Sequence, residues 1–463
     1  MNTIADHAAP AYRGKVILTC SIAALAGLLF GLDIGVISGA LPFLSREFAI
    51  DDRVQETIVS AMMLGAAIGA VLAAYLSWAL GRKYSLALGA VCFVVGSLAC
   101  AAAGGPAVLI GARLILGLAV GIASFTAPLY LSEIAPYRVR GAMISLYQLM
   151  ITVGILAAFL SNTAFSYSGS WRWMLGVIAL PASVLLAGVL ILPRSPRWLM
   201  IRGREQEALA VLSGLRESDA SARRELDEIR ASLRVPQQGL SLLRSSAPFR
   251  RSIALGMVLQ VMQQLTGINV VMYYAPRIFE LAGYGSAQEQ MWATVTVGAI
   301  NVLATFIAIA LVDRWGRKPI LHTGCAVMAS SLGILAALFH VGIVTSAQRL
   351  CAAGSLLTFI AGFAMSAGPL VWVLCSEIQP TRGRDFGIAV STLTNWLANM
   401  AAGATFLSLL RLLGPAATFG GYAALNLLFI VVVIAWVPET KGVSLDDIEA
   451  RLLGGAALRR IGR

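Results

Sequence analysis

Two charged residues lie inside long apolar segments of the chain, Asp33 in the first segment and Arg113 in the fourth. A charged side chain at the centre of a membrane helix costs about 2.5–3.5 kcal/mol on insertion scales, so such residues usually have a function. Burial disfavours the charged form of a carboxyl group, whereas a nearby cation favours it. A carboxyl group held between these effects can bind and release a proton. We therefore predict that Asp33 pairs with Arg113 and carries a proton, with a purely structural bridge as the alternative.

Side-chain amides in other apolar segments suit a neutral ligand with many hydroxyl groups, such as a sugar. Each amide offers two donors and an acceptor without a permanent charge. Hydrogen bonding between neighbouring helices is the alternative role for any one of them. The three amides between positions 263 and 269 cannot share one face of an unbroken helix, so we predict a break near Gly267 that lets them converge on a cavity. The amides are Gln148, Gln263, Gln264, Asn269, Asn301 and Asn395.

Two tryptophans lie within apolar segments rather than at their ends. An indole offers a flat face for a sugar ring and an N–H donor for a hydroxyl group. The usual alternative for tryptophan is a place at the membrane interface. Trp372 lies near Gly368, and Trp396 directly follows Asn395. We therefore predict that both indoles line the same pocket as the amides.

The elements that position these residues follow from composition. Of the 463 residues, 58% are hydrophobic and 13% are charged, whereas about a quarter are charged in soluble domains. A membrane-spanning helix needs about 20 mainly apolar residues, and twelve such segments predict an all-α membrane protein. The first segment is too long for a signal peptide and stays as a span. The predicted spans are 16–40, 56–79, 85–103, 107–130, 143–164, 171–192, 252–281, 291–312, 319–341, 350–375, 386–410 and 418–437.

The net charge of +12 is distributed very unevenly along the chain. An even number of spans places both termini on one side of the membrane. With these spans, that side holds 28 of the 35 Lys and Arg and 16 of the 23 Asp and Glu, and so the whole net charge. The positive-inside rule makes this side cytoplasmic. The basic charge is therefore interpreted as a topology signal, and binding of nucleic acid is not expected.

Small residues and cysteines have simpler interpretations. The segments Gly65–Gly69 and Gly117–Gly121 have glycines four residues apart, which predicts close helix contacts in lipid. The six cysteines lie within or at the ends of apolar segments, and none forms a Cys-x-x-Cys pair. With only three histidines, we predict no metal site, and we expect the cysteines to act as small buried hydrophobic residues.

The chain divides into two similar halves around a polar linker. We predict an N-terminal bundle at 1–192, a cytoplasmic linker at 193–251, a C-terminal bundle at 252–437 and a cytoplasmic tail at 438–463. Amphipathic spacing predicts short linker helices at 205–215 and 220–233. Parallel repeats of this kind suit rocking of two bundles around a site at the midplane. The repeated motifs are GRK at 81–83 and 316–318, SEIAP at 132–136 and SEIQP at 376–380, and PRSPR at 193–197 and PETK at 438–441.

These motifs, with QQLTGIN at 263–269, resemble the sugar porter branch of the major facilitator superfamily over residues 24–462. Stretches at 28–43, 147–152 and 374–387 are most similar to the bacterial galactose–proton and arabinose–proton symporters. The resemblance implies twelve transmembrane helices in two pseudo-symmetric six-helix bundles. It also implies a bacterial inner membrane location and import of a monosaccharide by proton symport. No cofactor is expected, and the implied functional unit is a monomer.

The resemblance implies roles for single residues as well. It places sugar contacts at the six amides and near both tryptophans, and it adds Phe30, Tyr273 and Gly368 to the substrate site. It assigns Tyr274 to the outer gate. Proton symporters of the family have an acid at the position of Asp33, and uniporters commonly have Asn. Asp33→Asn is therefore expected to abolish accumulation of sugar while sparing exchange down a gradient.

Charged residues at the predicted cytoplasmic helix ends form a possible latch. Opposite charges there can hold the two bundles together in an outward-facing state and separate when the inside opens. One surface ion pair is worth about 0–1 kcal/mol, so only a network could bias the equilibrium. Arg194 stands where the family often has an acid, and Trp78 stands where the second half has an acid, so we expect unequal latches. The predicted gating charges are Arg82, Glu133, Arg140, Asp313, Arg317, Glu377 and Arg384.

Several other functions are compatible with parts of this pattern. A facilitative sugar uniporter of the same fold is the nearest alternative to a symporter. A drug–proton antiporter is disfavoured because 152–162 lacks the Gly-Pro feature usual in the fifth helix. A membrane sugar sensor would need a signalling extension, and the tail from Pro438 has 26 residues. No nucleophile–base set or phosphate-binding loop predicts an enzyme.

Overall fold

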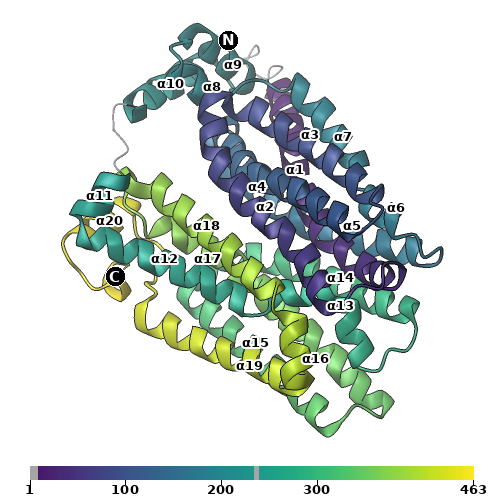
Figure 1. Cartoon of the computed structure of the whole chain (residues 1–463). Helices are drawn as coiled ribbons and strands as arrows, with labels where there is room; N and C mark the ends of the chain where they lie inside the picture. Colours follow the sequence, from purple (N-terminus) through teal and green to yellow (C-terminus); the bar gives the residue numbers. More distant parts are fainter. Residues whose placement is uncertain (1–8, 234–238, 463) are drawn as a thin grey trace.

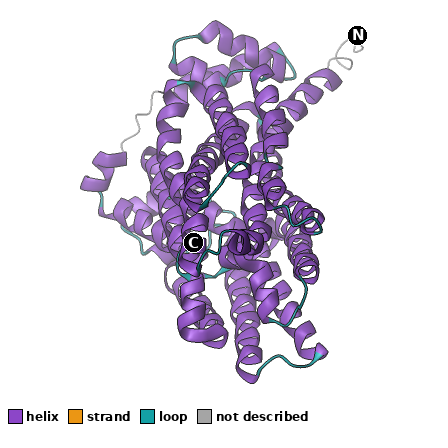
Figure 2. Cartoon of the chain, turned by 45° about the vertical axis from the view of Figure 1, so that its right-hand side comes forward, coloured by secondary structure: helices purple, strands orange, loops and turns teal. Residues whose placement is uncertain are grey.

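The computed structural model describes residues 9–233 and 239–462, without the side chains of 9–13 and 311–314. These residues form helices joined by short loops, and strands are absent from the described part of the chain (Figure 2). The helices make two separate groups, one from the first half of the chain and one from the second (Figure 1). The predicted all-α class and the division into two helical halves are therefore confirmed.

The first half, called the N-half below, contains the helices that carry Asp33 and Arg113. Asp51 caps the second helix by accepting a hydrogen bond from the Val54 N–H at 2.9 Å, which satisfies one of the free donors at a helix start. The helices of the N-half are α1 (Ala9–Glu47), α2 (Asp52–Ala79), α3 (Gly81–Ala101), α4 (Pro106–Ile134), α5 (Arg140–Ser166), α6 (Trp171–Gly176) and α7 (Ala179–Ile191).

The second half, called the C-half, repeats this arrangement with more breaks. Ser286 and Glu289 form a capping box at one helix start, and Thr345 and Gln348 form another. The helices of the C-half are α12 (Ala247–Leu265), α13 (Ile268–Leu281), α14 (Ala287–Trp315), α15 (Arg317–Val341), α16 (Ser346–Met365), α17 (Ala367–Glu377), α18 (Arg384–Gly403) and α19 (Phe406–Trp436), followed by α20 (Leu445–Leu453) in the tail.

The described residues of the linker form four short helices, of which the amphipathic spacing predicts the second and the third. They are α8 (Pro196–Ile201), α9 (Glu205–Leu215), α10 (Asp219–Leu233) and α11 (Gly239–Ser245). Trp198, Leu199, Leu212 and Leu226 form a small buried core of their own between α8, α9 and α10. Helices α8, α9 and α10 therefore add a packed layer at one end of the N-half, whereas α11 packs on α12 and α18 of the C-half. The end of the molecule that carries these four helices is called the linker face below (Figure 1).

Eleven helical segments of the described residues are long and apolar enough to cross a membrane. The twelfth predicted span, 386–410, does not meet that measure because α18 carries polar residues such as Thr394, Asn395 and Asn399. Its predicted end is also wrong, since α18 ends at Gly403 and α19 begins at Phe406. The next break, at Gly414 with φ 78°, lies between 410 and 418, where the predicted spans leave a gap.

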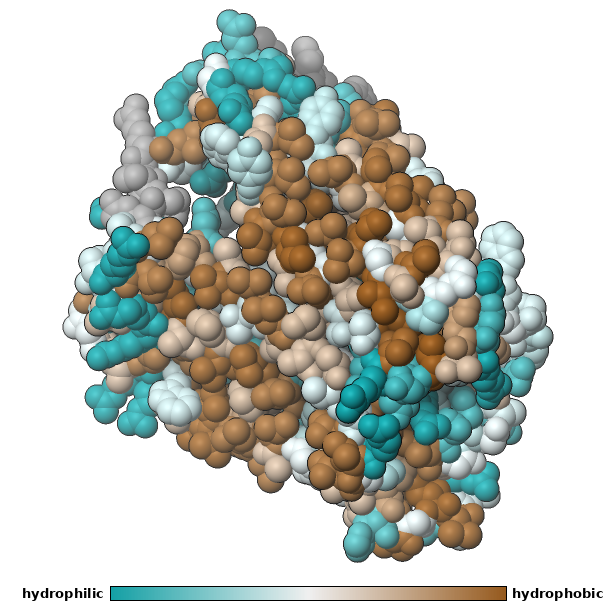
Figure 3. Space-filling view, in the orientation of Figure 1, coloured by the Kyte–Doolittle hydropathy of each residue, from teal (hydrophilic) through white to brown (hydrophobic). Residues whose placement is uncertain are grey.

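Exposed apolar side chains cover the visible outer surface between the two ends of the molecule. In Figure 3 the hydrophobic surface lies over the long helices, and hydrophilic residues gather at the linker helices and at the opposite end. Leu180, Ile191, Leu412 and Val431 are among the exposed apolar residues. A surface of this kind needs lipid as its solvent, so the chain is a multi-pass membrane protein.

The predicted glycine seams are confirmed between α2 and α4. A Cβ atom on Gly65 would overlap the carbonyl oxygen of Leu114, and one on Gly117 would overlap the carbonyl oxygen of Met62. The two backbones thus approach as closely as only small residues allow. Gly31 of α1 and Gly154 of α5 make an equally close seam. These contacts hold rigid pairs of helices within the N-half.

The cysteine prediction is only partly correct. Cys20, Cys100, Cys325 and Cys375 are buried, but Cys351 on α16 is exposed and Cys92 is half-buried. In a membrane protein an apolar segment has a lipid-facing side, so a residue within such a segment is not necessarily in the protein core.

The halves meet mainly at the face opposite the linker, called the far face below. Gly403 of α18 packs against Met63 and Val59 of α2, and Gly298 of α14 packs against Phe159 of α5. At the linker face, the ion pairs of the described gating charges lie within one half each. The structure is therefore closed at the far face and has its looser seam at the linker face.

Candidate functional site

Asp33 and Arg113 form an ion pair in the interior of the N-half. Arg113 Nη1 donates to Asp33 Oδ1 at 2.6 Å, and both side chains are 0% exposed. The pair joins α1 to α4. Asp33 Oδ2 and two nitrogens of the Arg113 guanidinium have no hydrogen-bond partner among the described atoms. Buried polar atoms without partners are rare and costly, so this site has unused capacity to bind a proton or a polar group.

The predicted break near Gly267 is present and separates α12 from α13. Gly267 has φ 92°, in the left-handed region that glycine occupies at little cost. A Cβ atom there would also lie 3.0 Å from Cδ1 of Tyr422. The break redirects the chain, so that residues before and after it can reach the same place.

Amides from both sides of this break form one hydrogen-bonded cluster. Asn269 Nδ2 donates to Gln264 Oε1 at 2.5 Å, and Gln264 Nε2 donates to Gln263 Oε1 at 3.3 Å. Asn395 of α18 donates to Gln263 Oε1 at 2.9 Å and to Gln260 Oε1 at 2.7 Å. The cluster therefore brings together four of the six predicted amides, from α12, α13 and α18.

The cluster also reaches the start of α17. Gln263 Nε2 donates to the carbonyl oxygens of Ala367 and Gly368, at 2.8 and 3.2 Å. Helix α16 ends before this point because Ser366 departs from helical geometry, with φ −131° and ψ −89°. The predicted residue Gly368 thus contacts the amides through its backbone.

Aromatic rings connect the two halves beside the amides. The rings of Phe30 on α1 and Trp396 on α18 lie 5.6 Å apart, in a tilted arrangement. Trp396 is buried, and its indole N–H has no hydrogen-bond partner among the described atoms. An unused donor next to amides is suited to a hydroxyl group of a ligand. Trp372 is 38% exposed and thus lies at a more open position.

The two neighbouring tyrosines of α13 are both buried in the C-half but have different partners. The Tyr273 hydroxyl accepts a hydrogen bond from Asn399 Nδ2 at 3.2 Å, and α13, which carries Tyr273, packs on α1, the helix of Asp33. The Tyr274 hydroxyl donates to the Gly403 carbonyl at 3.0 Å. Tyr273 therefore joins α13 to the polar side chains of α18, whereas Tyr274 belongs to the far face.

Two predicted amides lie outside this cluster. Within the described residues, neither Gln148 on α5 nor Asn301 on α14 takes part in its hydrogen bonds, although α5 and α14 pack on each other across the halves. Two other polar residues, Gln260 and Asn399, belong to the site and were not predicted. Both could have been found from helical spacing, because Gln260 precedes Gln263 by three residues and Asn399 follows Asn395 by four.

The linker-face charges of the N-half form a compact, buried group. Arg82 donates from Nε and Nη2 to the two carboxylate oxygens of Glu133, at 2.9 and 2.8 Å. Ser195 Oγ donates to the same carboxylate at 2.5 Å. Arg140 lies beside Glu133 in the lining of a pocket of about 150 Å³, but the Arg140 Nε atom has no partner in the described part of the chain.

The C-half repeats this group and adds a second acid, Glu439. Arg317 Nη2 donates to Glu377 at 3.2 Å, and Thr440, which matches Ser195, donates to Glu377 at 2.5 Å. Glu439 accepts from the backbone N–H of Arg317 and of Lys318, at 3.1 and 2.9 Å, and so caps the start of α15.

The N-half has no such cap because Arg194 stands at the position that matches Glu439. Its guanidinium instead lies over the rings of Tyr84 and Trp198, at 5.3 and 5.7 Å. The predicted inequality of the two charge groups therefore has a structural basis. Asp313 lies on α14, and its side chain is outside the described residues; the role of the group as a latch stays a prediction.

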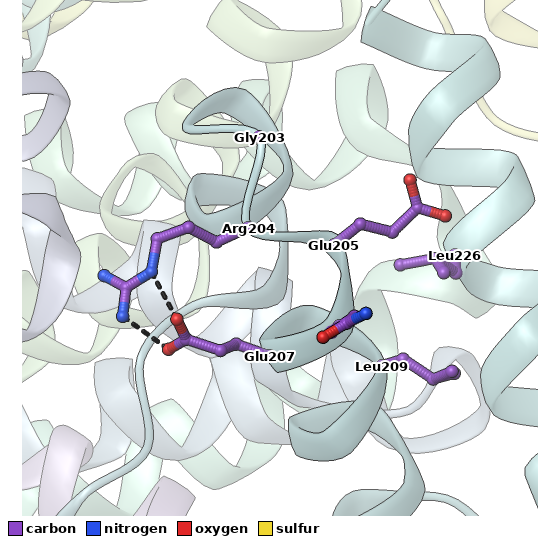
Figure 4. A pocket seen from close by; sticks show the side chains of 7 residues that line it. Gly203, Arg204, Glu205, Glu207, Leu209 and Leu226 are labelled. Carbon is purple, nitrogen blue, oxygen red and sulfur yellow. Dashed lines mark hydrogen bonds and ion pairs between the residues drawn. The ribbon is translucent and has the colours of Figure 1, made fainter.

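A larger surface pocket, of about 580 Å³, lies between α9 and α10 in the linker (Figure 4). Arg204 and Glu207 line it and neutralise each other through two hydrogen bonds of 2.5 Å. Leu209 and Leu226 form its apolar wall. It is distant in the fold from the amides and the buried ion pair, and it offers no free charge for a ligand.

Two helical halves with a polar cluster at their seam define a membrane transporter of the major facilitator fold. The family model described as "Sugar (and other) transporter" matches residues 19–452. The chain is 61% identical to the galactose-proton symporter of Escherichia coli K12, over 97% of both chains. It is 55% identical to the arabinose-proton symporter of the same strain, over 95% of this chain and 94% of the relative.

Solved structures of the xylose transporter from E. coli share the fold. The partially occluded inward-open conformation matches with a TM-score of 0.82 and 30% identity, over 93% of this chain and all of the other. The inward-open conformation matches with the same TM-score over 94% and 99%. The chain belongs to the sugar transporter family, and it is not an enzyme.

Proposed function

We propose that the chain imports a monosaccharide of the galactose or arabinose type together with protons, by alternating access in a bacterial inner membrane. The observation that carries this proposal is the amide cluster of Gln260, Gln263 and Asn395 next to the Phe30–Trp396 contact. It lies where the two halves meet and combines neutral donors and acceptors with aromatic faces. Sugars are bound by such combinations of polar and aromatic groups.

The substrate contacts follow from this placement. Gln260, Gln263, Gln264, Asn269 and Asn395 offer amides to sugar hydroxyls, and the backbone near Gly368 completes that wall. Trp396, Trp372, Phe30, Tyr273 and Asn399 supply the flat or hydroxyl-bearing surfaces. Gln148 and Asn301 lie on helices that pack across the halves, and they join the site when the halves close around the sugar.

Asp33 is the proton-binding group in this proposal, and Arg113 is its partner. A carboxylate with one free oxygen can accept a proton, which weakens its attachment to Arg113 and frees α1 relative to α4. Helix α13 packs on α1, and Tyr273 on α13 is hydrogen-bonded to Asn399, so protonation of Asp33 in the N-half can influence the sugar site in the C-half. A facilitative uniporter would lack this dependence on Asp33.

The orientation follows from the linker face and its charges. The positive residues of the linker support a cytoplasmic linker face, with both termini on the same side of the membrane. The far face is then periplasmic, and the structure is inward-facing. In this state the ion pairs of Glu133 and Glu377 each lie within one half, and these charge groups are proposed to latch the halves together in the outward-facing state. The functional unit is a monomer, since each half supplies part of one site.

Transport by purified protein in proteoliposomes tests the proposal. Galactose, arabinose, glucose and xylose are supplied as labelled sugars with and without an inward proton gradient. Accumulation of galactose or arabinose above equilibrium, only with the gradient, supports proton symport. Equilibration without accumulation would instead favour the uniporter, and absence of any sugar flux would contradict the proposed function.

A further inference from the structure

Glu56 is a buried acid that neither the sugar site nor the proton site uses. It lies in the first turns of α2, and its residue surface is 3% exposed. Its two carboxylate oxygens accept from Ser408, from the backbone N–H at 2.7 Å and from Oγ at 2.7 Å. Both partners of this contact are at the far face.

The contact between Glu56 and Ser408 is stabilised by its position at the start of a helix. Ser408 lies in the first turn of α19, where backbone N–H groups have no partner within the helix. A carboxylate at a helix start gains from the charge-assisted hydrogen bonds and from the helix dipole. Glu56 thus serves as an external cap for α19, and the cap comes from the other half of the molecule.

The surroundings show that this contact fixes the far-face seam. Gly403, just before α19, packs against Met63 and Val59 of the same helix that carries Glu56. The Gly403 carbonyl accepts from Tyr274, and the Tyr274 ring lies 5.2 Å from that of Phe406. Glu56 is therefore at the edge of a packed patch in which α2 meets α18 and α19.

The linker face has no equivalent bond between halves within the described residues. Its acids, the buried Glu133 and the partly buried Glu377, pair with Arg82 and Arg317 of their own halves. A hydrogen bond between halves at one face only stabilises the conformation in which that face is closed. Opening of the far face must break it.

We propose that Glu56 and Ser408 form the periplasmic latch of the inward-facing state, and that their separation accompanies opening to the outside. The names of the two faces rest on the proposed function; the latch itself is a property of the two halves. It differs from a permanent structural contact because it exists in one conformation and is lost in the other.

Distance measurements between spin labels test the latch. The full-length protein is placed in lipid nanodiscs, with its six cysteines replaced by alanine. One label pair, at Arg53→Cys and Leu412→Cys, reports the far face, and both positions are exposed. A second pair, at Tyr137→Cys and Arg382→Cys, reports the linker face at equally exposed positions.

We expect Glu56→Gln to lengthen the far-face distance and to shorten the linker-face distance. The population ratio should shift about tenfold toward the outward-facing state, which corresponds to about 1.4 kcal/mol. Ser408→Ala removes one of the two donors and should shift both distances in the same directions by less. Glu56→Asp retains the carboxylate and should stay nearer to the parent than Glu56→Gln.

Glu47→Gln is the matched control. Glu47 is also an acid at the far face of the N-half, but its partners Trp171 and Arg172 belong to the same half. This variant should leave both distances unchanged. Unchanged distances in Glu56→Gln and Ser408→Ala, or equal shifts in Glu56→Gln and Glu47→Gln, would overturn the latch. No sugar or proton gradient is present, so the outcome is independent of whether the transport proposal holds.

Discussion

Arg113 holds Asp33 through a single 2.6 Å contact in a place from which both side chains are fully excluded from solvent. One carboxylate oxygen and two guanidinium nitrogens are left without partners in the described structure. An optimised structural bridge would use these atoms in a paired, two-bond arrangement, as Arg82 and Glu133 do. The difference between the two bridges supports the proposal that Asp33 changes its protonation state during transport.

Replacement of Arg113 by alanine should destabilise the protein more than replacement of both partners. Removal of one member leaves an uncompensated buried charge, and such losses are about 3–5 kcal/mol. Arg113→Ala should therefore lower the unfolding temperature of the purified protein clearly. The double variant Asp33→Asn with Arg113→Met should recover most of that loss while failing to accumulate sugar. A double variant as unstable as Arg113→Ala would show that Arg113 does not stabilise the protein by neutralising the charge of Asp33.

Asn395→Ala should weaken sugar binding. The change leaves Gln260 Oε1 without its donor, takes one of two donors from Gln263 Oε1 and removes an amide from the proposed site. Loss of a partner in a buried polar site costs about 1–3 kcal/mol, which is roughly a tenfold to hundredfold loss of affinity. Equilibrium binding of labelled galactose to purified protein measures it.

Asn162→Ala is the control for this change. Asn162 is a buried amide in the N-half that donates to the Gly35 carbonyl at 2.9 Å, and it lies outside the cluster. Its replacement should affect stability but not sugar affinity. Equal losses of affinity in both variants would contradict the assignment of the cluster to the sugar.

Gly267→Ala should disturb the site through the backbone. Position 267 has φ 92°, and an added Cβ would lie 3.0 Å from Tyr422. We expect a loss of about 1–3 kcal/mol in stability, typical of strained backbone, together with weaker sugar binding. Gly285→Ala is the matched control, because nothing lies within 4 Å of its Cβ position. Equal unfolding temperatures for Gly267→Ala and Gly285→Ala would contradict the prediction that the chain needs glycine at the break.

Glu133→Gln should cost more stability than Glu377→Gln. The Arg82–Glu133 pair is bidentate with side chains 9% and 5% exposed, whereas the Arg317–Glu377 pair has one 3.2 Å contact at 15% and 19%. Deeper burial leaves the unpaired arginine with a larger cost. The unfolding temperatures of the two variants measure these losses. A larger loss in Glu377→Gln than in Glu133→Gln would contradict the prediction.

Local pattern was sufficient to predict most of the fold, because membrane helices must be long and apolar and because charge sets their orientation. It also predicted the break at Gly267 from the spacing of three amides. It did not predict the end of α18, because the mainly apolar residues 404–410 follow Gly403 directly and the sequence shows no polar boundary there. The boundary therefore depends on contacts between helices.

Only part of the candidate site could be predicted, because some of its contacts also depend on how the helices pack. Asn395, Gln263, Gln264 and Asn269 are polar in apolar surroundings and are visible in the sequence. The Glu56–Ser408 contact joins residues 352 positions apart, and neither position is unusual at a helix end. Only the packing of α2 on α19 shows that the acid is buried and that its partner belongs to the other half.

The most direct test is proton movement recorded while sugar enters proteoliposomes. In weakly buffered medium, addition of galactose or arabinose to liposomes with the parent protein should raise the external pH as protons enter with the sugar. Asp33→Asn should abolish this pH change while sugar still exchanges across the membrane. Proton uptake that persists in Asp33→Asn, or sugar entry without any proton movement in the parent protein, would contradict proton symport through Asp33.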